Sequence, residues 1–349
     1  MLRRIYLPGI FLFLSFINLN GQQTSGTIKR FGLFDSDEPL EITLRCDVTA
    51  YLRKKAAKDY MKAELVFNPD RPDSLAKQVR FRLRGVFRQR YCAMAPIELN
   101  FKKVKFGYSD LDSIDKLKMA TQCGFGTDDE RLVMREFLVY KMFSVFTDTS
   151  FRVRLLRINY IDINGHRKPM TQWGFFIEPA SMLEYRTSTI QITSDNLTQK
   201  HIFPFIMDRL AIFNYMAGNY DWSVPGQHNI KVFKPLNQPW NEYGIAVPFD
   251  FDWSGIVNAP YAQPVESIGL KSVRERLFLG ICRDIESYRR QFQLFESKKD
   301  KLYSIINEFS YLNSREKEDI TGFLDSFFIQ LKGNQNKILI DLKTNCKNF

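Results

Sequence analysis

Residues 153–178 read VRLLRINYIDINGHRKPMTQWGFFIE, and they divide a strand-rich first part of the chain from a helix-rich second part. Apolar and polar residues alternate on both sides of Asn164-Gly165, and an Asn-Gly pair in such a setting is typical of a tight β-hairpin. Val153–Asp162 and Gln172–Glu178 are therefore predicted to be paired strands. After Glu178 the alternation ends and helical spacing begins.

The chain before this hairpin contains further short alternating segments, which are separated by turn-forming residues such as Asn68–Asp73. These predicted strands are residues 40–48, 63–67, 79–85, 96–102 and 116–120. Residues 128–146 differ, because their apolar side chains recur at helical spacing behind an acidic first turn. The first part of the chain is therefore predicted to be a twisted antiparallel sheet with one inserted helix.

The second part contains four segments with apolar residues at helical spacing. They are residues 202–216, 272–290, 298–309 and 314–331. The predicted fold class is α+β, with a sheet-rich lobe at residues 22–178 and a mainly helical lobe at residues 179–349. A chain of 349 residues with 44% hydrophobic residues is long and apolar enough to build two such lobes, which excludes a disordered or fibrous protein.

The charge and the metal-binding residue types exclude several functions. The net charge is +11, but Lys and Arg are spread along the whole chain and match no nucleic-acid module, so no specific nucleic-acid partner is expected. The chain has three histidines, no Cys-x-x-Cys and no His-Glu-x-x-His, which argues against zinc ribbons and zinc proteases. Any metal is expected to have oxygen ligands.

The N-terminus is predicted to be a secretory signal peptide spanning residues 1–21. Met1–Arg4 is positively charged, Ile5–Ile17 is apolar, and a polar segment follows. The apolar run is shorter than the roughly 20 residues needed to cross a bilayer, although an uncleaved anchor stays an alternative. No later segment is predicted to cross a membrane, so the mature protein is expected to be secreted or periplasmic.

Export would allow the five cysteines to form lasting disulfides. Cys92 and Cys123 lie in the same half of the chain and are the predicted pair. Because five is an odd number, at least one thiol is expected to be free or to pair with another chain.

Two segments combine small, acidic and amide residues within aromatic sequence: Gly218–Lys231 and Val247–Gly255. Between them, residues 230–233 and 243–247 are predicted to form a hairpin, which would bring Asn229 and Asp250 to neighbouring strand ends. Carboxylate and amide oxygens at such a place suit a divalent cation. Each segment alone is equally typical of an ordinary turn.

Phosphoryl transfer needs a carboxylate that orients the attacking hydroxyl, and an Asn and an Asp that hold Mg²⁺ against the phosphates. Protein kinases place these as an Asp, an Asn a few residues later, a hairpin, and the metal-binding Asp. Asp221, Asn229, and Asp250 or Asp252 follow that order, with a longer spacing from Asp221 to Asn229 than the usual kinase loop.

Five motifs between about Val79 and Gly255 together resemble the CotH-type atypical kinases, the spore-coat kinase family. They are Arg82–Gly85, Arg135-Glu136, Asn164-Gly165 with Gly174–Glu178, Asn219–Asp221, and Phe249–Asp252. The resemblance implies a two-lobed protein-kinase-like fold with ATP and Mg²⁺ as cofactors. It also implies transfer of the γ-phosphate to a hydroxyl on a protein or a cell-surface polymer.

The resemblance assigns roles to individual residues. Asp221 would be the catalytic carboxylate, Asn229 with Asp250 or Asp252 would bind Mg²⁺, and Glu136 would pair with a phosphate-binding lysine. The family carries this lysine just before the strand after Arg-Gly, where this chain has Ala93–Pro96. The choice among Lys102, Lys103 and Lys118 stays open, with Lys118 favoured because its strand leads toward the Glu136 helix.

Other residues are candidates for phosphate binding. Arg84, Arg88 and Arg90 alternate and would share one face of a strand, where they either bind phosphate or form a solvated basic surface. His228 would contact a phosphate or assist Asp221, or serve as a structural hydrogen bonder. The glycine-rich phosphate loop is missing, because Gly85 stands alone.

Two alternatives to an active kinase follow from these departures. The first is a catalytically inactive kinase-like binding protein of the cell envelope. The second is a metal-dependent hydrolase that acts on phosphate esters through the same Asp and Asn residues.

Overall fold

The computed structural model describes residues 29–53, 59–239, 243–264, 266–332 and 335–347. The predicted signal peptide and its cleavage site lie outside these ranges. Within them, no helix has the length and apolar character that crossing a bilayer requires.

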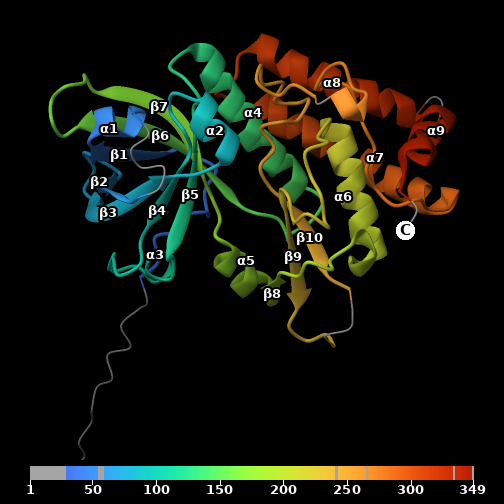
Figure 1. Cartoon of the computed structure of the whole chain (residues 1–349), viewed down its shortest axis with the longest axis horizontal. Helices are drawn as coiled ribbons and strands as arrows, with labels where there is room; N and C mark the ends of the chain where they lie inside the picture. The colour runs from blue at the N-terminus through green and yellow to red at the C-terminus, as the bar shows by residue number, and fades with distance from the viewer. Residues whose placement is uncertain (1–28, 54–58, 240–242, 265, 333–334, 348–349) are drawn as a thin grey trace, which may run out of the picture.

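Seven strands in the first half of the chain close into a barrel (Figure 1). Around the barrel they follow the order β1 (Leu40–Cys46), β2 (Met61–Phe67), β3 (Leu75–Leu83), β4 (Ile97–Asn100), β5 (Lys116–Thr121), β7 (Met170–Ile177) and β6 (Val153–Asp162). All neighbours are antiparallel except β1 and β6, which pair in parallel with Leu40 opposite Leu156 and Cys46 opposite Asp162. Buried side chains such as Leu44, Phe81 and Ile158 fill the interior.

The predicted antiparallel sheet lobe of a two-lobed kinase-like fold is wrong, because this sheet is a closed barrel with mixed strand directions. The parallel contact between β1 and β6 joins segments far apart in the sequence, and local alternation carries no information about such pairing. Closure satisfies the backbone N–H and C=O groups that an open sheet would expose at its edges. The described residues of this part form four helices instead of the single one predicted: α1 (Val48–Leu52), α2 (Val86–Tyr91), α3 (Ser109–Asp112) and α4 (Thr127–Ser144).

Helix α4 connects the barrel to the rest of the molecule. It begins after Gly126, whose backbone N–H donates to the Asp129 carboxylate, and its first turn is acidic, which suits the positive end of a helix. One side of α4 packs on β6 and β7. Its other apolar side chains, including Phe143, join the core of the second half.

The second half combines a small sheet with helices (Figure 1). The sheet has the order β10 (Ile245–Pro248), β9 (Ile230–Pro235) and β8 (Thr189–Ile192). The helices are α5 (Ala180–Thr187), α6 (Pro204–Ala217), α7 (Ile285–Glu308), α8 (Ser314–Lys332) and α9 (Gln335–Asn345), with short 3₁₀ turns at Gln199–His201 and Glu266–Ile268. The helix predicted at residues 298–309 is present within α7, and the one predicted at 272–290 is helical only from Ile285, because residues 272–284 are not helical. The predicted break between the two is wrong, since α7 is continuous.

Two disulfides tie segments of this fold together. The predicted pair Cys92–Cys123 is confirmed, and Cys282–Cys346 forms a second pair that the sequence did not reveal. Cys46 is buried and has no disulfide partner in the described part of the chain. The two disulfides are compatible with an extracellular or periplasmic protein.

Candidate functional site

The loop after α6 places Asp221, His228 and Asn229 in one hydrogen-bonded group. Helix α6 ends at Gly218, whose φ of +68° is readily adopted only by glycine and turns the chain into this loop. His228 Nε2 lies 2.8 Å from Asp221 Oδ1, and Asn229 Nδ2 donates to Asp221 Oδ2 at 2.9 Å. Both oxygens of the Asp221 carboxylate are thereby held in place from the same loop.

The hairpin of β9 and β10 brings the second predicted segment beside the first, as expected. The Phe249 backbone N–H donates to the Asn229 carbonyl at 2.9 Å, so Asn229 and Asp250 lie at neighbouring strand ends. Both have positive φ values, +51° for Asn229 and +64° for Asp250, a conformation that costs energy for residues other than glycine. Such strain is common at binding and catalytic sites.

Asp250 has one contact from the barrel and one from α4. Its Oδ2 lies 4.0 Å from an Arg84 guanidinium nitrogen, which places the predicted Arg84 at this site. Its backbone N–H donates to the buried Tyr140 hydroxyl at 2.8 Å. Tyr140 therefore helps to hold Asp250 in its unusual backbone conformation.

Asp252 and Glu136 are buried carboxyl groups, and the pKa of each is raised. Burial and the nearby Asp250 raise the pKa of Asp252 to about 7. Burial, followed by the charge of Asp252, raises the pKa of Glu136 well above its usual range. The Tyr261 hydroxyl donates to Asp252 Oδ2 at 3.1 Å. These raised pKa values favour the protonated carboxyl groups, and a cation bound beside them would favour the ionised forms instead.

The cation that pairs with Glu136 is Arg88 and not Lys118. Arg88 lies on α2, is buried, and places a guanidinium nitrogen 3.5 Å from Glu136 Oε2. A second nitrogen donates to the Thr121 carbonyl at 2.6 Å. The prediction that Arg84, Arg88 and Arg90 share a strand face is wrong, because β3 ends at Leu83 and residues 86–91 form a helix. Gly85 is the sequence feature that could have indicated the end of the strand, because a lone glycine often ends a strand.

Lys118 lines a cavity of about 420 Å³ between the barrel and the small sheet, which also contains Lys116, Lys231 and the turn into α5 at Glu178–Ser181. Burial, followed by the positive charges of Arg84 and Lys231, lowers the pKa of Lys118 from 10.5 to about 8. Its ammonium group lies 4.9 Å from the centre of the Phe249 ring, next to Asp250. The carboxylates of Glu98, Asp115 and Glu178 line the same cavity, and Glu98 lies 3.9 Å from the Lys116 ammonium group, so the cavity contains charges of both signs.

The predicted metal ligands alone form only an incomplete binding site for Mg²⁺. Among the described residues, no three or more His, Cys, Asp or Glu side chains gather as a metal site. Mg²⁺ in phosphoryl-transfer proteins is usually held by one or two carboxylates together with substrate phosphates. Asp250, Asp252 and the Asn229 side chain therefore suit a metal that arrives with a phosphate-bearing ligand, better than a permanently bound one.

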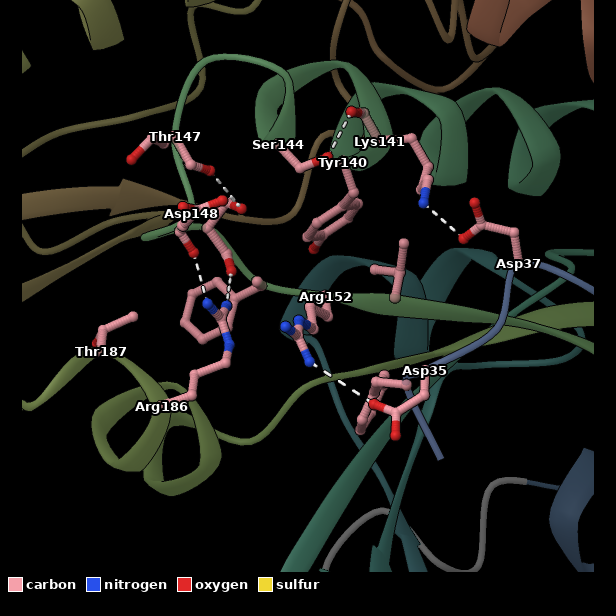
Figure 2. Close-up of a pocket in the computed structure, with 14 residues that line it drawn as sticks. Asp35, Asp37, Tyr140, Lys141, Ser144, Thr147, Asp148, Arg152, Arg186 and Thr187 are labelled. Atoms are coloured by element: carbon pink, nitrogen blue, oxygen red, sulfur yellow. Dashed lines mark hydrogen bonds and ion pairs between the residues drawn. The ribbon is translucent and has the colours of Figure 1, made fainter. Parts of the chain in front are cut away.

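A second, larger cavity of about 610 Å³ is lined by Tyr140 and by polar and charged residues of several segments (Figure 2). Its cations are already partnered: Lys141 Nζ lies 2.6 Å from Asp37, and Arg186 donates to Glu178 and to backbone carbonyls. Arg152 lies 3.8 Å from Asp35. The cavity contains none of the predicted site residues, although Tyr140 links it to Asp250.

The comparisons with known proteins identify no relative. No family model matches the chain, and no curated protein matches it. The resemblance to CotH-type kinases therefore rests on the sequence motifs alone.

Proposed function

We propose that this protein is a Mg²⁺-dependent phosphotransferase that moves the γ-phosphoryl group of ATP to a hydroxyl on a protein or a surface polymer. The observation that carries the proposal is the Asp221 carboxylate, held by His228 and Asn229, beside a strand end that bears Asp250. The proposal rests on this side-chain chemistry and not on a kinase fold.

Asp221 is assigned to the acceptor hydroxyl. Its carboxylate is about one-third exposed, at 30%, and each oxygen retains a lone pair after the bonds from His228 and Asn229. In the transfer, the acceptor oxygen forms a bond to the γ-phosphorus while the bond to the bridging oxygen of ADP breaks. The hydroxyl proton passes to Asp221, which also orients the attacking oxygen.

The remaining residues are assigned to ATP and its metal ion. Asp250, Asp252 and Asn229 would hold Mg²⁺, which supplies positive charge to the phosphates when it is bound. Lys118, from the neighbouring cavity, would contact a phosphate, because an anion relieves the repulsion between Lys118, Arg84 and Lys231. The motifs that resemble CotH-type kinases support the same assignment.

A catalytically inactive binding protein is the second candidate, and one contact favours it. Glu136 pairs with Arg88, which is anchored to the Thr121 carbonyl, and not with a lysine that faces the cavity. In this case the site would bind a nucleotide or another phosphate-bearing ligand without turnover.

The first experiment is a thermal-shift titration of the mature protein with ATP and Mg²⁺ together and with each alone. Saturation at 100 times the Kd should add about 2.7 kcal/mol of stability. Asp250→Asn should abolish the shift that requires both ligands, whereas Asp70→Asn, in the exposed turn between β2 and β3, should leave it unchanged.

A transfer assay with γ-labelled ATP and envelope extract then separates the two candidates. Asp221→Asn should keep the thermal shift and lose labelling of the acceptor by at least about 100-fold, since general base catalysis contributes 10²–10⁴-fold. A wild-type protein that binds ATP with Mg²⁺ and labels nothing supports the inactive candidate. Full labelling by Asp221→Asn would remove the catalytic assignment.

A further inference from the structure

Lys118 on β5 differs from the other lysines of the cavity beside the barrel. The Lys116 side chain is 55% exposed and lies 3.9 Å from Glu98, and Lys231 donates to a glutamine side chain at 2.8 Å. Among the described residues, Lys118 has no hydrogen bond or ion pair, and its ammonium group lies 4.9 Å from the centre of the Phe249 ring. No acceptor in this part of the chain therefore holds Lys118 in its protonated form.

The carboxylates of the cavity are bound to other groups or lie at the surface. Glu98, opposite Lys118 on β4, accepts from the Arg82 guanidinium at 3.0 Å and from a tyrosine hydroxyl at 2.8 Å. Glu178, just after β7, pairs with the arginine near the end of α5 at 2.8 Å. Asp115 is an exposed residue. The two less exposed carboxylates are thus already partnered and do not neutralise Lys118.

Apolar side chains form the part of the cavity wall beside Lys118. Ile177 is its partner on β7, and Phe249 faces its ammonium group. Phe151 packs near Phe249, and both Phe151 and Ile177 are only 4% exposed. The cavity volume of about 420 Å³ admits a small organic molecule, and an apolar body would contact these side chains.

The surroundings favour the neutral form of the Lys118 amine. Burial has the largest effect on its pKa, followed by the positive charges of Arg84 and Lys231, and together they lower it from 10.5 to about 8. The negative charges of Asp250 and Glu98 act in the opposite direction with smaller effect. At about pH 7.5 such an amine is about one quarter neutral, against about 0.1% for an ordinary lysine. A neutral lysine amine is a nucleophile, and burial beside other cations is a common way to activate it.

We propose that Lys118 is a covalent binding site for a small aldehyde or ketone with an apolar body, which it holds as an imine in this cavity. Its Nζ forms a bond to the carbonyl carbon while the π electrons of the C=O bond move to the oxygen. The oxygen then leaves as water together with both hydrogens of the amine, and the C=N bond forms. This inference does not rest on the proposed function, because a phosphate contact uses the protonated amine and imine formation uses the neutral one.

The test compares two lysines of the same strand in one reaction. The mature protein is incubated at about pH 7.5 with benzaldehyde and cyanoborohydride, which reduces each imine to a stable amine. Peptide mass spectrometry then measures the rate of modification at each lysine. Lys118 should react at least about tenfold faster than Lys116. This ratio is smaller than the difference in neutral amine, because nucleophilicity falls with pKa.

A competitor and a variant separate binding in the cavity from exposure alone. Benzyl alcohol, which has the same apolar body but forms no imine, should slow the reaction of Lys118 and leave that of Lys116 unchanged. Lys231→Met removes a neighbouring cation at similar length and should slow Lys118 by about threefold, whereas Lys102→Met, at an exposed residue outside the cavity, should not. A Lys118 rate no greater than that of Lys116, or one that benzyl alcohol does not lower, overturns the proposal.

The outcome is separate from that of the thermal-shift titration. A shift that requires ATP and Mg²⁺, together with slow modification of Lys118, keeps the proposed function and overturns only the imine site. Rapid modification of Lys118 that benzyl alcohol slows, in a protein that shows no such shift, keeps the imine site and counts against the proposed function.

Discussion

Replacing Glu316 by glutamine should destabilise the protein strongly, because Glu316 is the main partner of a buried arginine. Arg135 on α4 is 6% exposed on its side chain, and its Nε donates to Glu316 Oε2 at 2.8 Å. The same guanidinium reaches Asp319 at 2.7 Å and the Ile256 carbonyl at 3.1 Å. This group joins α4 to α8 and to the loop that follows Asp252.

The magnitude follows from the charge left unpaired. Removal of one partner from a buried ion pair usually costs about 3–5 kcal/mol. Asp319 remains paired with Arg135, but it is 40% exposed and also pairs with Arg274. It therefore compensates only in part for the lost charge of Glu316. We therefore expect Glu316→Gln to lower the free energy of unfolding by about 3 kcal/mol.

Urea unfolding, followed by tryptophan fluorescence and by circular dichroism, measures this loss. The midpoint should fall by about 1 M, given a slope of about 3 kcal/mol/M. Glu318→Gln is the matched control, because Glu318 is an exposed residue of the same helix and should shift the midpoint by less than about 0.2 M. A Glu316→Gln protein whose stability stays within about 1 kcal/mol of the wild type would show that Arg135 does not depend on this partner.

Three further predictions concern Tyr140, the second disulfide and Lys118. Tyr140→Phe leaves the partly buried Asp250 N–H without its acceptor and should cost about 1 kcal/mol of stability in urea unfolding; no loss would mean that water replaces the hydroxyl. Removal of the Cys282–Cys346 disulfide, which spans 64 residues, should cost about 4 kcal/mol in the same assay, and an unchanged midpoint would contradict the loop-entropy argument. Burial and nearby cations lower the pKa of Lys118 from 10.5 to about 8, so the unfolded chain binds more protons between these values. The free energy of unfolding should therefore rise from pH 8 to pH 10.5 more in the wild type than in Lys118→Met. The control Lys116→Met should show the same pH dependence as the wild type.

Much of the local structure could be predicted from the sequence. The strand at Val153–Asp162 has the predicted bounds, and the helix predicted at 128–146 is found as Thr127–Ser144. The hairpin between the two acidic segments is present as β9 and β10. These elements have strong apolar periodicity or a clear turn signal, and both depend only on nearby residues.

The candidate site was predictable only in part. Asp221, His228 and Asn229 are neighbours in sequence, and the hairpin brings Asp250 beside them, so their grouping followed from local patterns. The partner of Glu136 could not be predicted from such local patterns. Arg88 reaches Glu136 because a short helix replaces the expected strand and a disulfide fixes its end, and no periodicity in six residues reveals such a helix.

The sequence by itself determined where most strands and helices lie, and which acidic and amide residues share one loop, because these properties arise from side chains a few positions apart. Only the tertiary structure decided that the sheet closes into a barrel, that Lys118 lines a cavity with Lys116 and Lys231, and that Arg88 pairs with Glu136. These features depend on contacts between distant segments, whose pairing is set by the packing and backbone hydrogen bonding of the whole chain.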